Sequence, residues 1–140
     1  MLKYARKRIY AYKEISVMKS FINIAKVLSD ETRLRILRVL MLADRPLCIC
    51  EIVDSLELAQ YNVSRHMKEL KVTGLVSEQK EGRFVFYSLL PQNDPGIRHM
   101  LKAVELIPDE YIASDRERLK KRLGKRVDGK CCYAGASRKG

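Results

Sequence analysis

The sequence predicts a mostly α-helical fold with one small β-hairpin, and three observations support it. Two short amphipathic segments, 49–56 and 60–71, are separated by only three residues. The periodicity then changes from helix to strand. Two strand-like segments, 75–80 and 83–89, flank a turn at Gly82, as in a β-hairpin. Helix, tight turn, helix and hairpin in this order predict a winged helix-turn-helix.

Three further helices are expected before this unit. The first carries its apolar residues at a 3-4-3 spacing: Leu2, Ala5, Ile9 and Tyr12. Such a helix is too short to be stable alone, so we expect it to pack on another surface, such as a second subunit. The second carries Phe21, Ala25 and Leu28. Asp30 then serves as the N-cap of the third, which ends before a turn at 43–46.

Two helices are expected after the hairpin. Asp94 and Pro95 form an N-cap followed by proline at the first helical position, and the apolar stripe of that helix consists of Ile97, Leu101 and Val104. A basic helix then stops at Gly124 and is followed by a tail. We therefore divide the chain into a DNA-binding and dimerisation domain at 1–108 and a basic C-terminal helix and tail at 109–140, with dimerisation through the N- and C-terminal helices.

Composition narrows the class of protein further. The 140 residues suit one compact domain. No apolar run approaches the ~20 residues of a membrane span, and the N-terminus has no signal-peptide pattern, so a cytoplasmic protein with reduced cysteines is expected. The net charge is +11, and most of it lies in two arms, 1–13 and 116–140. Such arms often attract nucleic acid phosphates, although they can also serve only solubility.

The second helix of the predicted helix-turn-helix has one apolar and one polar face. Val63, Met67 and Leu70 face inward. The side chains expected to contact DNA come from the rest of this helix and from the hairpin tip: Gln60, Tyr61, Asn62, Ser64, Arg65, His66, Lys68, Lys80 and Arg83. Glutamine, asparagine and arginine suit bidentate contacts to base edges, whereas serine and lysine suit phosphates. For His66, either support of the helix or contact with DNA is expected.

These motifs together resemble one family. The matching stretches are Ala25–Leu37, Val63–Leu70, Gly74–Val76, Glu81–Arg83 and Tyr87–Leu89. They are similar to the arsenical-repressor (ArsR) family of metal-sensing repressors, over about residues 20–107. The resemblance implies a homodimer that binds a palindromic DNA operator and leaves it when a metal or metalloid binds. One departure is Ala59, where the family usually offers a capping serine or threonine.

Cys48 and Cys50 lie in the motif Pro46-Leu-Cys-Ile-Cys-Glu51. It is similar to the Leu-Cys-Val-Cys-Asp motif of arsenical and cadmium/lead repressors, which implies that both cysteines bind the inducing ion. Thiolates are soft ligands that suit thiophilic ions. Residues i and i+2 of an α-helix point ~200° apart, so the two thiols cannot share one ion on an intact helix. Binding must either unwind the first turn or use an irregular start after Pro46.

The third ligand of the family commonly lies one turn further on, where this chain has Val53. The remaining thiols, Cys131 and Cys132, are therefore candidates to complete the site, from the same chain or from its partner. Trivalent arsenic or antimony is favoured as inducer, with cadmium or lead as the alternative, and a thiol-redox-sensing repressor is a further alternative. A zinc site through His99 is poorly supported because no second histidine follows it. An enzyme is not expected, because Cys48-Ile-Cys50 lacks the C-x-x-C spacing of thiol-disulfide oxidoreductases.

Overall fold

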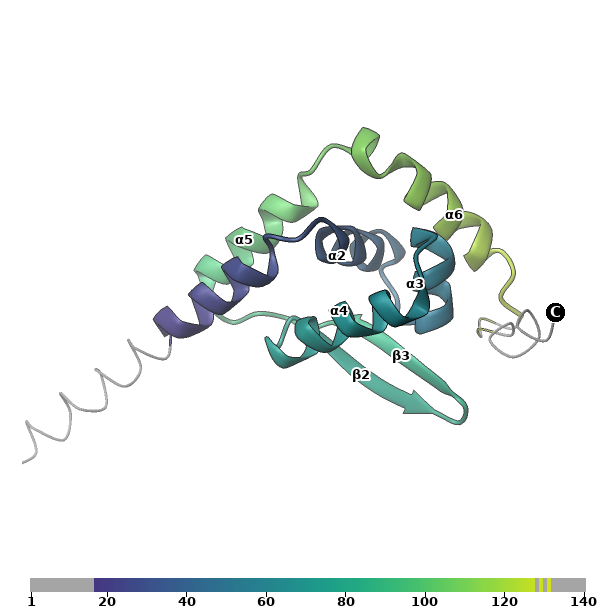
Figure 1. Ribbon diagram of the computed structural model, residues 1–140, viewed down its shortest axis with the longest axis horizontal. Coiled ribbons are helices and arrows are strands. Elements are labelled where there is room, and N and C mark those ends of the chain that lie inside the picture. The colour runs from purple at the N-terminus through teal and green to yellow at the C-terminus, as the bar shows by residue number, and fades with distance from the viewer. Residues whose placement is uncertain (1–16, 128, 130, 132–140) are drawn as a thin grey trace, which may run out of the picture.

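A computed structural model describes residues 17–127, 129 and 131 of the chain (Figure 1). The predicted helix at Leu2–Tyr12 and Cys132 lie outside these residues. A helix, here called the N-terminal helix, occupies residues 17–27. The elements that follow are α2 (Glu31–Ala43), β1 (Leu47–Cys48), α3 (Ile49–Leu56), α4 (Gln60–Val72), β2 (Val76–Glu81), β3 (Phe84–Leu89), α5 (Pro95–Glu105), the 3₁₀ helix η1 (Asp109–Ile112) and α6 (Ala113–Leu123).

The predicted hairpin is confirmed, and the structure adds a third strand to it. The sheet is antiparallel in the order β1-β3-β2. Gly82 forms the hairpin turn with a φ of 60°, a left-handed conformation that glycine adopts without strain. The two residues of β1 pair with Tyr87 and Phe86 of β3. Because Leu47 and Cys48 are buried, pairing with β3 gives their backbone groups hydrogen-bonding partners.

Helix α2 forms the centre of the hydrophobic core. Its N-cap, Asp30, accepts a hydrogen bond from the backbone N–H of Arg33 (3.0 Å), as predicted for this residue. The helix ends at Asp44, which takes a left-handed conformation. Its buried apolar side chains include Ile36, Leu37, Val39 and Leu40. Through them α2 packs against α3, α4, α5 and α6, so it holds the rest of the domain in place.

Helices α3 and α4 form the helix-turn-helix. Glu57 ends α3 in a left-handed conformation, and α4 begins three residues later. The predicted inward residues Val63, Met67 and Leu70 are all buried against the core. Ala59 is the N-cap of α4 and supplies no side-chain hydrogen bond, as expected from its apolar side chain. The position of α4 therefore depends on packing against α2 and α3 rather than on a cap.

The C-terminal helix α6 crosses the side of the domain that α3 forms (Figure 1). Its Leu119 joins the core. Three arginines of α6 and of the residues after it pair with three acidic residues of α3 and of its C-terminal end. These pairs are Arg118 with Glu57 (3.5 Å), Arg122 with Asp54 (2.8 Å) and Arg126 with Glu51 (2.7 Å). Part of the predicted basic arm thus binds the protein itself. Within the described residues, no helix is long and apolar enough to cross a membrane.

Candidate functional site

The outer face of α4 presents most of the predicted DNA-contacting side chains to solvent. The exposed residues of this group are Gln60, Tyr61, Asn62, Ser64, Arg65 and Lys68. Tyr61 is 76% exposed, which is unusual for an aromatic side chain on a packed helix. Lys80 and Arg83 are also exposed, on either side of the hairpin turn. A polar helix face next to a basic hairpin tip is an arrangement that can fit a DNA major groove and the adjacent backbone.

His66 lies apart from this exposed face. Its side chain is only 13% exposed, and its Nδ1 atom is 3.4 Å from Nη1 of Arg33 and 4.0 Å from a carboxylate oxygen of Asp30. Both partners belong to the start of α2. The structure therefore places His66 between α2 and α4, apart from the other predicted DNA-contacting side chains.

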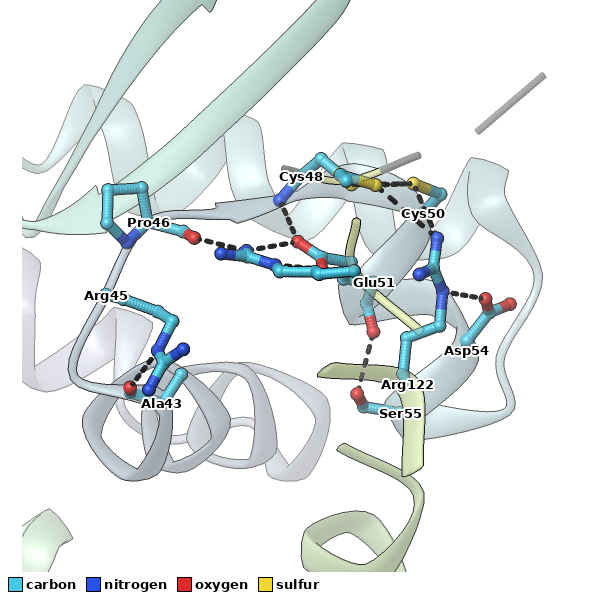
Figure 2. Close-up of polar contacts among 11 residues, drawn as sticks. Ala43, Arg45, Pro46, Cys48, Cys50, Glu51, Asp54, Ser55 and Arg122 are labelled. Atoms are coloured by element: carbon cyan, nitrogen blue, oxygen red, sulfur yellow. Dashed lines mark hydrogen bonds and ion pairs between the residues drawn. The ribbon is translucent and has the colours of Figure 1, made fainter. Parts of the chain in front are cut away.

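Cys48 and Cys50 meet because α3 begins between them. Cys48 is the N-cap of α3 and has an extended backbone (φ −78°, ψ 159°), so it does not follow the helical spacing. Its backbone N–H donates to the carboxylate of Glu51 (3.0 Å). The two Sγ atoms lie 2.6 Å apart (Figure 2). Of the two routes considered from sequence, the irregular start after Pro46 is the one that the structure has.

Cys131 supplies a third thiol from the same chain. Its Sγ atom lies 2.7 Å from that of Cys48 and 3.3 Å from that of Cys50. All three residues are buried, and Phe84 and Phe86 of β3 pack against them. The three ligand atoms lie within 4.8 Å of one another. Sulfurs that share one ion at ~2.3 Å each can lie up to about 4.6 Å apart, so the cluster suits a single soft ion.

Two arginines, which sequence reasoning did not single out, hold this cluster together. Nη2 of Arg122 donates to the sulfurs of Cys50 (3.5 Å) and Cys131 (3.4 Å), while its Nε donates to Asp54 (2.8 Å; Figure 2). Arg126 makes a bidentate ion pair with Glu51, both bonds being 2.7 Å, and also donates to the carbonyl of Pro46. The four-residue spacing of the basic side chains in 118–126 was the available signal in the sequence.

The contacts within the cluster shift the pKa values of Cys48 and Cys50 in opposite directions. Hydrogen bonds from the thiols of Cys48 and Cys131, together with the charge of Arg122, outweigh burial and lower the pKa of Cys50 to about 6. The hydrogen bond to Cys50 and burial both raise the pKa of Cys48 above its usual value. At neutral pH the cluster therefore contains a thiolate, which is the form that binds soft metals and metalloids.

Comparison with known proteins decides the family. Residues 30–78 match the family model described as "Bacterial regulatory protein, arsR family". The chain is also 35% identical over 94 residues to the arsenic resistance transcriptional regulator ArsR1 of Pseudomonas putida, which covers 67% of this chain and 73% of that protein. The chain belongs to the ArsR family. It is therefore a DNA-binding, metal-responsive transcriptional repressor and not an enzyme, as the sequence predicted.

Two further similarities agree with this assignment. The ArsR-family chain is 36% identical over 85 residues to a cadmium resistance transcriptional regulatory protein CadC homologue of Staphylococcus aureus, covering 61% of this chain and 66% of that protein. Its fold is that of a homodimeric winged helix-turn-helix DNA-binding domain from Mycobacterium bovis. That similarity has a TM-score of 0.56 and 21% identity, and covers 71% of this chain and 87% of that one. The predicted winged helix-turn-helix is confirmed.

Proposed function

We propose that this ArsR-family protein leaves its operator when trivalent arsenic, or antimony, binds to Cys48, Cys50 and Cys131. The observation that supports this is the convergence of three buried thiols within 4.8 Å. Among the described residues the candidate ligands of this cluster are all thiols, which favours a thiophilic ion over magnesium, calcium or manganese. Three sulfur ligands, each forming one bond, complete the valence of trivalent arsenic. A relative named as an arsenic resistance regulator supports the same choice.

Ion binding at this cluster acts on both DNA-contacting elements. Cys48 pairs with Phe86 on the hairpin, and it also caps α3, which packs against α4. The sulfurs of Cys48 and Cys50 are 2.6 Å apart and must separate to surround an ion at ~2.3 Å from each. That separation displaces the start of α3 relative to β3. The ion therefore binds best to a conformation that presents α4 poorly, and this difference in affinity weakens DNA binding.

The active form is a homodimer on a palindromic operator. The N-terminal helix exposes four apolar side chains: Val17, Met18, Phe21 and Ile22. This helix lies beside α5, and Phe21 approaches Gly96 at the start of α5. Four exposed apolar side chains on one short helix are typical of a subunit interface. A two-fold dimer presents its α4 helices about 34 Å apart, one turn of DNA.

Cysteine-to-serine variants test the proposed inducer. The DNA is a duplex selected from a random pool by the reduced wild-type protein, and its release is followed by fluorescence anisotropy during arsenite titration. Cys48→Ser, Cys50→Ser and Cys131→Ser should bind this DNA nearly as well as wild type but should lose release by arsenite, because two thiols are too few. Cys132→Ser is the matched control and should respond normally. Full release from Cys48→Ser would exclude the cluster as the sensor.

X-ray absorption of the arsenite complex counts the sulfurs directly. Three sulfurs in wild type and two in Cys131→Ser are expected. Three in both would remove Cys131 from the site.

A cadmium- or lead-responsive repressor is the second candidate, supported by the similarity to a cadmium resistance regulator. Titration of cadmium chloride against the same protein–DNA complex, under the same reducing conditions, compares the two ions. A redox-sensing repressor is the remaining alternative. It predicts release by peroxide and restoration by a thiol reductant, with no response to either ion in reduced protein.

A further inference from the structure

We infer that Arg122 determines which ions the three-thiol cluster accepts, by favouring the anionic complexes that three thiolates form with divalent soft cations. This inference rests on the proposed function in that it uses the same three ligands. The guanidinium of Arg122 contacts two of the sulfurs directly. Its Nη2 atom lies 3.5 Å from Sγ of Cys50 and 3.4 Å from Sγ of Cys131. Arg122 is itself only 4% exposed.

Ions that bind three thiols leave different charges behind. When arsenous acid reacts with three thiols, three As–S bonds replace three As–O bonds and three waters leave, so the complex is neutral. When Cd²⁺ binds, the protons that remain on the thiols go to solvent and the cadmium–trithiolate complex carries one negative charge. A buried negative charge is costly unless a positive group lies against it. Arg122 compensates the cadmium complex and has no comparable charge to compensate in the arsenic complex.

The surrounding charges leave Arg122 able to act on the sulfurs. Asp54 pairs with the Nε atom of Arg122, but its side chain is 51% exposed, so water screens part of its charge and it offsets Arg122 only in part. Among the described residues the other cation near the cluster is Arg126, whose Nε and Nη2 atoms both donate to buried Glu51. The Nη2 edge of Arg122 points to the cluster from α6 (Figure 2). Among the described residues, Arg122 is therefore the positive group that acts most directly on the sulfurs.

The test measures affinity for two ions in the reduced full-length protein. Cadmium chloride binding is followed by thiolate-to-cadmium absorption in competition with a chelator, and sodium arsenite binding by calorimetry. In Arg122→Gln the ratio of cadmium to arsenite affinity should fall about tenfold or more, because only the cadmium complex is charged. Arg122→Lys should recover part of the cadmium affinity. Arg118→Gln is the matched control: it removes another α6 arginine bound to α3, and both affinities should stay near wild type.

A second variant, expected to change the affinity ratio in the opposite direction, keeps the inference testable if Arg122→Gln does not fold. Asp54→Asn removes an exposed negative charge next to Arg122, so the ratio of cadmium to arsenite affinity should rise. Equal losses for both ions in Arg122→Gln would make Arg122 a structural clamp and overturn the inference, as would an unchanged ratio in Asp54→Asn. A different result would contradict the proposed function alone. In that case the wild type would not bind arsenite through three sulfurs, while its cadmium affinity would still depend on Arg122.

Discussion

Replacing Glu51 by glutamine should destabilise the protein, because it breaks the most deeply buried ion pair among the described residues. The side chain of Glu51 is fully buried and that of Arg126 is 10% exposed. Glutamine has nearly the same size and can still accept the backbone N–H of Cys48. The change therefore removes the charge while leaving the shape and one hydrogen bond in place.

The expected loss follows from this environment. Removing one partner of a buried ion pair typically costs about 3–5 kcal/mol, because the other charge stays buried without compensation. Arg126 keeps its bond to the carbonyl of Pro46 and lies near solvent, which places the expected cost at the lower end, about 3 kcal/mol. For a chain of this length, that corresponds to a fall in Tm of roughly 10 °C.

The pH dependence gives a second, independent readout. Despite burial, which raises it, the hydrogen bonds from Arg126 and from the backbone of Cys48 lower the pKa of Glu51 below its usual 4.5. A lowered carboxyl pKa contributes stability above the unfolded-state value, and that contribution is lost as the pH falls through the folded-state value. The difference in unfolding free energy between wild type and Glu51→Gln should therefore be full at pH 7 and shrink below about pH 4.5.

Urea denaturation followed by circular dichroism, at pH 7 and pH 4, measures both effects. Glu110→Gln is the matched control, since Glu110 is exposed and its replacement should cost little. Arg126→Gln should cost a similar amount, and the double variant should cost much less than the sum of the two. A loss below about 1 kcal/mol at pH 7, or a loss independent of pH, would refute the reasoning.

Three further predictions concern DNA binding and the core. Arg65→Ala should lower affinity for the selected DNA by about 1–3 kcal/mol and relax sequence preference. If Arg65→Ala binds the selected DNA and random DNA with the same two affinities as wild type, the groove contact is disproved. Deleting residues 1–13, which lie outside the described residues, should flatten the log–log salt dependence of DNA binding by ~0.9 per lost phosphate contact. An unchanged slope would assign this arm to packing or solubility. Met67→Ala should cost about 2–5 kcal/mol in urea denaturation, because this side chain is buried under α4.

The sequence by itself was sufficient for the helix-turn-helix and the hairpin. Val63, Met67 and Leu70 repeat with helical spacing, and Gly82 marks the hairpin turn, so local patterns encode these elements. The pairing of β1 with β3 could not be predicted in the same way. Two residues are too few to show a strand period, and their conformation depends on a partner strand almost forty residues away.

The thiol site shows the same division. The position of Cys48 and Cys50 in the sequence was enough to predict them as ion ligands. Because two thiols are too few for the site, the cysteines near the C-terminus were predicted to supply the third ligand. Only the tertiary structure decided that Cys131 reaches them within the same chain, and that Arg122 and Arg126 accompany it. The physical reason is that α6 is fixed by ion pairs and core contacts with helices more than sixty residues earlier. Periodicity reports which face of a helix is buried, but it does not report which distant surface buries it.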